Sequence, residues 1–371
     1  MEIKLVDLKA QYLSIKTEID QAISDCLINS TFIGGEKVKS FEENFASFCD
    51  ANYCASCANG TDALEIALKV VGINREDEVI VPAMTFIATA EAVTNSGGKI
   101  VFCDVNSKTY NIDTEKLESL ITAKTKAIIA VHLYGQMAAM DKLQKIKKQY
   151  NLTLIEDAAQ AHGATFNRNP VGHYSDIATF SFYPGKNLGA YGDGGALITN
   201  NEPFYSEVKK IANHGRIIKY EHVLEGRNSR LDTLQASVLN VKLKYLKEWN
   251  EKRREIVKNY EEFLSDIPEI TRPHQHPDSN SVYHLYVVKT IPESRNNLFN
   301  YLKSQGIYAG IHYPEALPNL KAYDYLGHHP EDFPVATQLA KQVISLPIYP
   351  ELSIDKIEFI CNSIKEFYQN N

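Results

Sequence analysis

Short apolar runs alternate with stretches of helical periodicity through the first 250 residues of the chain. The runs at 78–82, 99–104, 127–132, 152–155 and 177–182 predict buried strands. Between such runs, apolar residues recur every three or four positions, as they do over 63–70, and this spacing predicts amphipathic helices. Strands that alternate with helices in this way predict an α/β fold, with a mostly parallel central sheet flanked by helices.

Helical periodicity also marks the two ends of this α/β region. Residues 6–27 have helical spacing, and we expect an N-terminal arm or helix over residues 1–30. A long helix is expected from Thr233 past Trp249. Beyond residue 250 the pattern predicts a smaller α+β unit, with strands at 284–288 and 307–310 and helices at 252–263, 295–305, 333–343 and 354–367. We therefore expect a large domain at 31–250 and a small C-terminal domain at 251–371.

Candidate chemistry is concentrated between residues 152 and 195. One expected strand ends on Asp157, and the next, which contains Ser181, leads into a turn where Pro184 and Gly185 precede Lys186. Proline and glycine stop regular structure, so Lys186 is left in a turn from which it can reach inward. In open α/β sheets, ligands bind at the carboxyl edge of the strands, which is where these residues are expected.

Taken one at a time, these residues have ordinary explanations. Asp157 could cap a helix, Ser181 could be a strand hydroxyl, and Lys186 could be a solvated loop residue. Together they are the amine, the anion and the hydroxyl that pyridoxal 5′-phosphate requires for a Schiff base, a protonated ring nitrogen and a bound phosphate. The stretch is therefore a candidate binding site for that cofactor, and the ordinary explanations stay open on the residue types alone.

Two segments of this stretch carry a family resemblance. Residues 156–163 (EDAAQAHG) and 180–195 (FSFYPGKNLGAYGDGG) resemble the fold-type I aminotransferases of the DegT type, which act on nucleotide-linked keto-sugars, and the resemblance extends over nearly the whole chain. It implies that Lys186 binds the cofactor covalently and serves as the base and acid of the proton shift. It also implies that Asp157 contacts the ring nitrogen and Gln160 the ring hydroxyl.

Two further contacts with the cofactor are expected nearer the N-terminus. The turn Gly60, Thr61 and Asp62 opens a helix, and backbone N–H groups at the positive end of a helix suit a phosphate, although a plain helix cap would also explain these residues. The resemblance favours the phosphate turn. Phe86 could lie in the core, but the matching aromatic residue in the family stacks on the pyridine ring.

The segment 213–232 is rich in hydrogen-bond donors and has no periodic pattern, which is typical of a loop. A solvated surface would explain it. In the family, however, this loop reaches across a dimer, and the residue matching Asn228 contacts the partner's cofactor phosphate. The candidate sugar contacts are Tyr183, Lys219, Tyr220, Arg230, His312 and Tyr313. After Pro314 the sequence departs from the Pro-Leu-His run that relatives often carry.

The resemblance also narrows the expected reaction. Residues 183–195 and 228–231 are most similar to the branch that aminates C3 of dTDP-3-keto-6-deoxyhexoses, which implies glutamate as a donor, a homodimer with composite sites, and amino sugars of the kind found in lipopolysaccharide O-antigen. Three alternatives are considered: amination at C4, a regulator that binds pyridoxal phosphate without turnover, and a sugar dehydratase. Relatives that dehydrate at C3 replace the lysine with histidine, so Lys186 argues against the last.

Composition narrows the remaining possibilities. The formal net charge of −7 disfavours a broad nucleic-acid surface, and no apolar run has the length of a signal peptide core or a membrane span, so we expect a cytoplasmic protein. The six cysteines suggest no disulfide framework. Cys54 and Cys57 form a lone C-x-x-C pair, best explained by buried thiols in a strand, and His274 and His276 lack partners. We therefore expect no metal site.

Overall fold

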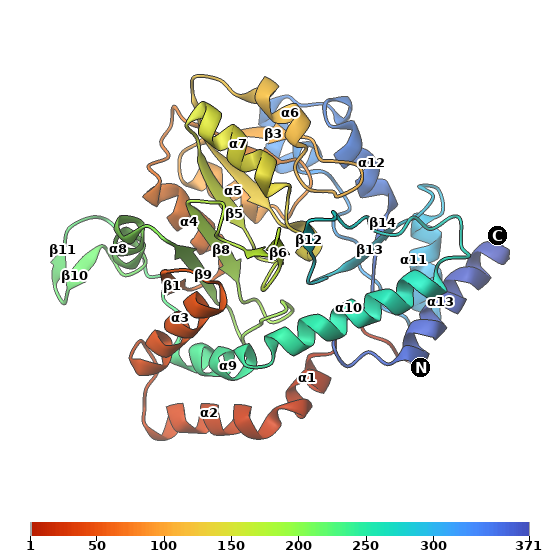
Figure 1. Ribbon diagram of the computed structural model, residues 1–371, viewed down its shortest axis with the longest axis horizontal. Helices are drawn as coiled ribbons and strands as arrows, with labels where there is room; N and C mark the ends of the chain where they lie inside the picture. Colours follow the sequence, from red (N-terminus) through yellow and green to blue (C-terminus); the bar gives the residue numbers. More distant parts are fainter. Residues whose placement is uncertain (1, 371) are drawn as a thin grey trace.

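The computed structural model describes residues 2–370 and is built on a seven-stranded sheet (Figure 1). Its spatial order is β1 (Tyr53–Cys57), β9 (Gly195–Thr199), β8 (Ile177–Ser181), β5 (Thr153–Asp157), β4 (Thr125–Val131), β2 (Glu78–Pro82) and β3 (Lys99–Cys103). Strand β9 pairs antiparallel with both of its neighbours, and the other adjacent strands pair in parallel. The predicted α/β class with a mostly parallel sheet is confirmed.

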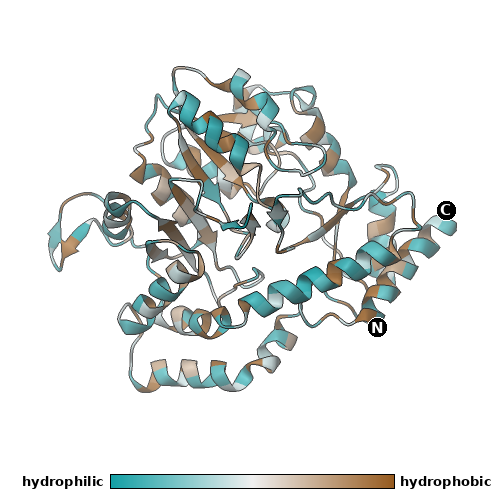
Figure 2. Ribbon diagram, in the orientation of Figure 1, coloured by the Kyte–Doolittle hydropathy of each residue, from teal (hydrophilic) through white to brown (hydrophobic). Residues whose placement is uncertain are grey.

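Helices cover both faces of the sheet, because alternate strand residues point to opposite sides. Val79 and Ile129 pack with the helices α4 (Gly60–Val70), α5 (Ala88–Asn95) and α8 (Glu202–Ile211). Ile80 and Ile128 pack with α3 (Glu36–Phe48) and α7 (Met140–Tyr150) on the other face. Figure 2 shows the result: apolar strands run through the centre, and hydrophilic residues cover the outer turns of α7. Each layer of helices therefore buries its apolar side chains against one face of the sheet.

The second unit gathers around the helix α10 (Leu246–Phe263). It contains α11 (Arg295–Ser304), α13 (Ile354–Gln369) and the antiparallel pair β13 (Tyr286–Lys289) and β14 (Val343–Leu346), whereas α12 (Pro334–Gln342) packs in the apolar cluster that also holds α4 and α5. The strand predicted at 307–310 is wrong. Ile307 forms a single bridge to Ile3 and Gly310 a single bridge to Ser345, so no continuous ladder with one partner develops. The strand that pairs with β13 is instead β14, which the sequence analysis did not predict.

The predicted long helix is divided into α9 (Thr233–Leu243) and α10. The backbone N–H of Tyr245 donates to the carbonyl of Lys242, three residues back, at 3.0 Å. Such bonds tighten the backbone and interrupt the regular four-residue spacing of an α-helix. Helix α10 then runs without interruption across residue 250, the predicted limit between the two domains, and that limit stays a prediction.

The N-terminal segment forms α1 (Leu8–Ser14) and α2 (Lys16–Ile28), and α2 packs against α9 through Ile19 and Val238. Within the predicted loop 213–232, the strands β10 (Arg216–Ile218) and β11 (Glu221–His222) pair as a hairpin. Figure 1 shows this hairpin projecting from the body of the molecule, at the left of the view. The pairing was not predicted, because neither strand has an alternating pattern long enough to detect.

The remaining elements are short. They are α6 (Thr114–Leu117), the strands β6 (Thr165–Phe166), β7 (Asn169–Pro170) and β12 (Ser279–Asn280), and the 3₁₀ turns η1 (Glu118–Leu120), η2 (Leu133–Gly135), η3 (Leu317–Asn319), η4 (Lys321–Leu326) and η5 (Pro330–Asp332). Within residues 2–370, no helix combines the length and apolar character needed to cross a bilayer.

Candidate active site

Lys186 lies in a closed loop immediately after β8, at the carboxyl edge of the sheet. Its backbone N–H donates to the Tyr183 carbonyl at 2.9 Å, and the N–H of Ala190 donates to the Phe182 carbonyl at 2.8 Å. A Cβ on Gly189 would lie 2.3 Å from the carbonyl oxygen of Pro184, so a larger residue cannot fit without moving the loop. The loop therefore holds Lys186 at the edge where the sequence analysis expected it.

The amine of Lys186 has a lowered proton affinity. Burial lowers its pKa to about 8, and the carboxylate of Asp157 opposes the shift. The residue as a whole is partly exposed. A sizeable fraction of Lys186 is therefore neutral near physiological pH and available as a nucleophile or base.

Asp157 ends β5 with its carboxylate held from two sides. Its side chain is almost fully buried, with Oδ2 accepting a hydrogen bond from Thr89 Oγ1 at 2.8 Å and Oδ1 accepting one from the Ala159 N–H at 3.2 Å. None of the ion pairs found within residues 2–370 involves Asp157. A buried carboxylate that makes no direct ion pair within the protein is suited to a cationic ligand group. The sequence analysis missed Thr89, which orients this carboxylate.

Gln160 connects the two units of the protein beside Asp157. Its Oε1 accepts from the Tyr134 N–H at 2.6 Å, and its Nε2 donates to Tyr313 Oη at 3.2 Å. The Tyr134 hydroxyl in turn donates to the carbonyl of His312. Because an amide nitrogen has two hydrogens, one N–H of Gln160 is left for a ligand, which is compatible with the expected contact to a ring hydroxyl.

The expected phosphate turn touches the end of β8. A Cβ on Gly60 would lie 2.6 Å from the Cβ of Ser181, so this glycine allows the turn to approach the strand closely. Asn59 caps the helix by accepting from the Asp62 N–H at 2.8 Å, and the N–H groups of Gly60 and Thr61 precede the first intrahelical donors. These groups and the Ser181 hydroxyl form a compact set of donors.

The side chain of Asp62 has a different partner. Arg227 donates to its Oδ1 at 2.9 Å and also pairs with Glu65. Asp62 can therefore contribute to an anion site through its place in the turn, but its carboxylate is engaged by Arg227. This ion pair ties the turn to the segment that carries Asn228.

The candidate substrate residues His312, Tyr313 and Tyr183 lie around this edge. His312 Nδ1 lies 2.8 Å from Ser345 Oγ, and burial together with the charge of Lys186 lowers its pKa to about 4. The ring of Tyr313 lies 5.9 Å from that of Phe86, centroid to centroid. Phe86 is 55% exposed, so a large part of this aromatic side chain is free to contact a ligand. Tyr183 is also exposed.

Other expected site residues are not brought to this edge within one chain. Tyr220 is 84% exposed on the projecting hairpin, and Lys219 Nζ lies 5.0 Å from the centroid of its ring. Asn228 is exposed and forms a bridge with Asn213, and Arg230 is partly exposed. Across residues 2–370, no hydrogen bond or ion pair links these side chains to Lys186 or Asp157.

Two histidines that the sequence analysis did not single out also surround Lys186. Burial and the positive charge of Lys186 lower the pKa of His162 to about 3 and that of His284 well below its usual range. His284 Nδ1 lies 3.2 Å from Oδ1 of Asn187, and Asn187 donates to Asn250 at 2.9 Å. His162 falls within the family-like string, but no local signal in the sequence could have placed His284 beside the lysine.

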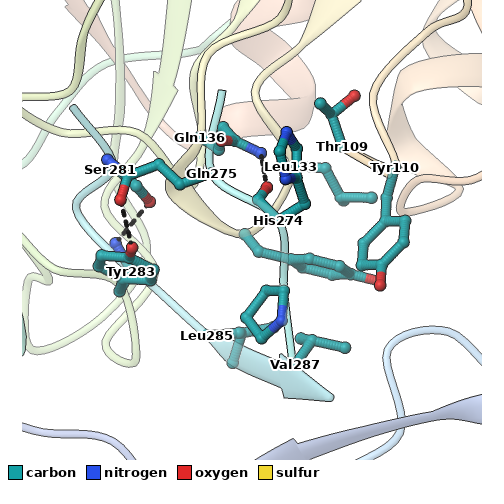
Figure 3. A pocket seen from close by; sticks show the side chains of 12 residues that line it. Thr109, Tyr110, Leu133, Gln136, His274, Gln275, Ser281, Tyr283, Leu285 and Val287 are labelled. Carbon is teal, nitrogen blue, oxygen red and sulfur yellow. Dashed lines mark hydrogen bonds between the residues drawn. The ribbon is translucent and has the colours of Figure 1, made fainter. Parts of the chain in front are cut away.

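A small cavity lies between residues of the two units (Figure 3). It measures about 30 Å³, close to the volume that one water occupies, and is lined by Thr109, Tyr110, Leu133, Tyr134, Gln136, Pro273, His274, Gln275, Ser281, Tyr283, Leu285 and Val287. Gln136 Nε2 donates to the carbonyl of His274 at 3.1 Å across it. Neither Lys186 nor Asp157 lines the cavity, so it is a packing gap between the units.

The cysteine and histidine pairs fall outside the site. Cys54 and Cys57 are buried free thiols in β1, which confirms the preferred explanation of that pair. His276 Nδ1 lies 3.9 Å from Asp278, and His274 contributes its backbone carbonyl to Gln136. In the part of the chain that the structure describes, no group of three or more histidine, cysteine, aspartate or glutamate side chains is arranged to hold a metal ion.

The residues at the carboxyl edge fit pyridoxal phosphate. They supply an amine that is partly neutral near pH 7, a buried carboxylate that makes no direct ion pair within residues 2–370, and a helix-opening turn packed against Ser181. This combination, on a sheet of this topology, defines a pyridoxal phosphate-dependent aminotransferase of fold type I.

Comparison with known proteins gives the family. The sequence profile of the DegT/DnrJ/EryC1/StrS aminotransferase family matches residues 13–365, and the chain belongs to this family. It is 42% identical to a dTDP-3-amino-3,6-dideoxy-alpha-D-galactopyranose transaminase of Aneurinibacillus thermoaerophilus, over 98% of this chain and 99% of that protein. It is 41% identical to the erythromycin biosynthesis sensory transduction protein EryC1 of Saccharopolyspora erythraea, over the same shares.

A solved structure supports the same assignment. The crystal structure of S. venezuelae DesV in complex with a ketimine intermediate is 37% identical, superposes with a TM-score of 0.96, and covers 99% of this chain and 98% of that one. The chain is therefore a pyridoxal phosphate-dependent enzyme of the sugar aminotransferase class, and the two units of the fold have the arrangement found in that class.

Proposed function

We propose that this protein transfers an amino group from glutamate to C3 of a dTDP-linked 3-keto-6-deoxyhexose. The observation that supports this most strongly is the partly neutral amine of Lys186 beside the carboxylate of Asp157, on a chain of this family. The transaminase from Aneurinibacillus thermoaerophilus, whose name specifies a dTDP-3-amino sugar, supports the choice of nucleotide and carbon. The product would suit the assembly of surface polysaccharides such as lipopolysaccharide O-antigen.

The cofactor would be held by residues from four segments of the chain. In this proposal Lys186 provides the covalent attachment, Asp157 and Gln160 contact the pyridine ring, and Phe86 stacks on it. Gly60, Thr61, Asp62 and Ser181 form the phosphate turn of the same chain, and Asn228 completes it from a second copy. When bound, the cofactor supplies an electron sink that stabilises negative charge on the carbon that loses its proton.

Lys186 would carry the proton in both halves of the reaction. With a pKa near 8, its Nζ can take a proton from the α-carbon of the amino-acid donor and hold it as an ammonium group. Lys186 would start and end each half as a neutral amine: in the first half Nζ would pass the proton from the α-carbon on to the cofactor, and in the second half it would take a proton back from the cofactor and deliver it to C3 of the sugar.

The surroundings of Lys186 favour this role. His162 and His312 have pKa values of about 3 and about 4, because both are buried and face the positive charge of Lys186. They are neutral at working pH and add no further positive charge that would lower the pKa of Lys186 more. Asp157 is the anion that offsets part of the burial cost.

We further propose a homodimer with composite sites. The projecting hairpin exposes Ile217, Ile218 and Tyr220, and contiguous apolar side chains on a surface mark an interaction site. Lys219, Asn228 and Arg230 lie on the same segment without a contact to Lys186 of their own chain, so a second copy can bring them to its sugar and phosphate. A cytoplasmic location fits the free thiols of all six cysteines.

The test is a reaction with a panel of substrates. Purified protein is incubated with pyridoxal phosphate, glutamate and nucleotide-linked 3-keto and 4-keto sugars, and the products are identified by mass spectrometry and NMR. We expect a 3-amino sugar with dTDP as the nucleotide. A 4-amino product would replace the C3 assignment with amination at C4 and leave the catalytic residues in place.

A second candidate comes from another class of protein. The relative from Saccharopolyspora erythraea has a name that describes sensory transduction, which favours a regulator that binds pyridoxal phosphate without turnover. The net charge of −7 disfavours direct contact with nucleic acid. DNA binding in a gel-shift assay at physiological salt, together with no turnover of any keto-sugar, would establish this candidate in place of the enzyme.

A further inference from the structure

Helix α9 places a buried lysine against the segment that follows Lys186. Lys242 is 0% exposed, its Nζ donates to the carbonyl oxygen of Gly189 at 2.7 Å, and the same atom lies 4.1 Å from the centroid of the Tyr191 ring. No carboxylate pairs with it among the ion pairs of residues 2–370. Burying an amine whose partners are one carbonyl and one aromatic ring costs more free energy than placing an apolar side chain at the same core position.

A second side chain from the same face of α9 holds the next residues of the loop. Gln235 lies seven positions before Lys242, which is two helical turns, so both side chains point the same way. Its Oε1 accepts from the Tyr191 N–H at 2.8 Å. The carbonyl of Gly189 and the N–H of Tyr191 are therefore both fixed by α9.

This contact reaches Lys186 through a short, tightly packed loop. Gly189 packs so closely on Pro184 that a Cβ would approach its carbonyl oxygen to 2.3 Å. The N–H of Ala190 donates to the carbonyl of Phe182 at 2.8 Å, and that of Lys186 to Tyr183 at 2.9 Å. A displacement of Gly189 would therefore be transmitted to the turn that presents the Lys186 amine.

We propose that Lys242 is a positioning residue for Lys186: by holding the carbonyl of Gly189, it fixes the loop that presents the amine at the carboxyl edge of the sheet. The inference rests on the proposed role of Lys186. It assigns Lys242 a function for which a well-packed apolar residue would not serve, because an apolar side chain would leave the buried Gly189 carbonyl without a donor.

Lys242→Met is expected to affect folding stability and the position of Lys186 in opposite ways: the fold should keep or gain stability, while the Lys186 amine should be less well placed. Burial lowers the pKa of Lys242 to about 7 from 10.5, so between these values the unfolded chain binds more protons than the folded one, and wild-type stability rises with pH. The titratable group facing it, Tyr191, has its pKa raised to about 12 by burial and by the nearby Tyr12 and Asp20, so it stays neutral across this window. A methionine of similar length removes the cost of the buried amine, which at pH 6 exceeds the cost of leaving the Gly189 carbonyl without a donor.

The experiment measures folding and loop geometry separately in Lys242→Met, in Lys242→Gln and in the control Lys244→Met. Lys244 belongs to the same helix end but is exposed and pairs with Glu18 on the surface. Thermal unfolding is followed at pH 6 and pH 9. The rate at which the cofactor-free protein captures pyridoxal phosphate is followed by visible absorbance, and kcat and KM are measured on the loaded enzyme.

We expect Lys242→Met to melt at or above the wild-type temperature at pH 6, with a smaller gain at pH 9. Its capture rate and kcat should fall about tenfold or more, with KM within a factor of about two, because small displacements of a reacting group are costly. Lys242→Gln, which keeps an N–H donor, should lose less, and Lys244→Met should match the wild type. Unchanged capture and kcat in Lys242→Met, or a variant that melts well below the wild type or does not fold, would overturn the inference.

A separate measurement distinguishes failure of the proposed function from failure of the role of Lys242. Borohydride reduction of the wild-type complex, followed by peptide mass analysis, identifies the lysine that binds the cofactor. Labelling of a lysine other than Lys186 would remove the basis of both proposals. Labelling of Lys186 together with wild-type behaviour of Lys242→Met would leave the proposed function intact and reject only the role of Lys242.

Discussion

The carboxyl edge of β5 and β8 and the projecting hairpin at 216–222 differ in how their polar residues are held. At the edge, Asp157 is fixed by Thr89 and the N–H of Ala159, and Lys186 sits in a loop closed by its own backbone. On the hairpin, Tyr220 is nearly free of contacts and faces solvent together with two isoleucines. The edge is therefore organised within one chain, while the hairpin exposes neighbouring apolar side chains of the kind found at interaction sites.

The largest loss of activity is expected from substitution of Lys186 at the carboxyl edge. Lys186→Ala should abolish turnover and the visible absorbance of the covalent complex with pyridoxal phosphate, because residues 182–194, the loop after β8, contain no other lysine. Absorbance spectra and product formation measure both. Lys186→Arg is the matched control: it keeps the positive charge but does not lose its proton at working pH, so it should be equally inactive. Residual turnover of either variant near wild-type level would refute the assignment of the lysine.

The next effect concerns the anion of the edge. Asp157→Asn should lower kcat by about two to three powers of ten, since an amide no longer keeps the ring nitrogen protonated, and losing this buried charge costs about 3–4 kcal/mol. Thr89→Val removes one hydrogen bond to the same carboxylate and should cost about tenfold. Steady-state kinetics measure both variants. An Asp157→Asn enzyme within a few fold of wild type would show that the ring nitrogen has another partner.

The edge could be predicted from the sequence because its signals are local. Asp157 directly follows an apolar run, Lys186 directly follows Pro184 and Gly185, and the two strands concerned are near in sequence as well as in space. The strand alternation that predicts the parallel sheet is also a local pattern. Resemblance to the family then supplied the roles of residues whose types alone have ordinary explanations.

The remainder depends on contacts between distant segments. His284 meets Asn187 across 97 positions, and Lys242 reaches Gly189 across 53. No spacing rule connects such pairs. Strand β14 was missed because it pairs with β13 from more than fifty residues away, whereas the predicted strand at 307–310 has two different single-bridge partners. The break between α9 and α10 left no proline or glycine as a signal.

The third prediction tests whether Asn228, in the segment that carries the hairpin, acts in the site of a second copy. Asn228→Ala should be impaired about 30-fold or more if this residue completes the phosphate site of a second copy. Mixing it with Lys186→Ala after subunit exchange should restore about a quarter of the wild-type sites, since half of the randomly paired dimers are hybrids with one intact site each. Activity is measured together with exchange by native mass spectrometry. Exchange without recovery would mean that Asn228 acts within its own chain.

The fourth prediction uses the proton affinity of Lys186. Its pKa of about 8 lies below the ordinary value of 10.5, so the neutral amine increases as pH rises toward 8 and is nearly complete above it. The rate at which the cofactor-free protein captures pyridoxal phosphate should rise about tenfold per pH unit below 8 and then level off. Stopped-flow absorbance between pH 6 and pH 10 checks this. A rate that keeps rising to pH 10 would indicate an unshifted lysine.

The smallest effect is expected at Phe86, which belongs to the edge but is half exposed like the hairpin residues. Phe86→Leu removes an aromatic face worth about 0.5–1.5 kcal/mol, so the dissociation constant for pyridoxal phosphate should rise about two- to tenfold. The melting temperature of the cofactor-free protein should hardly change, because the ring contributes little to the core. Equilibrium titration and thermal unfolding measure the two quantities.

Tyr313→Phe provides the comparison for that variant. It keeps the ring 5.9 Å from Phe86 but removes the hydroxyl that accepts from Gln160 Nε2. If stacking is the role of Phe86, cofactor affinity should fall in Phe86→Leu and change less in Tyr313→Phe, whose remaining ring still supports the aromatic pair. The reverse order, with unchanged affinity in Phe86→Leu, would assign Phe86 to packing against Tyr313 and leave the pyridine ring to other contacts at the edge.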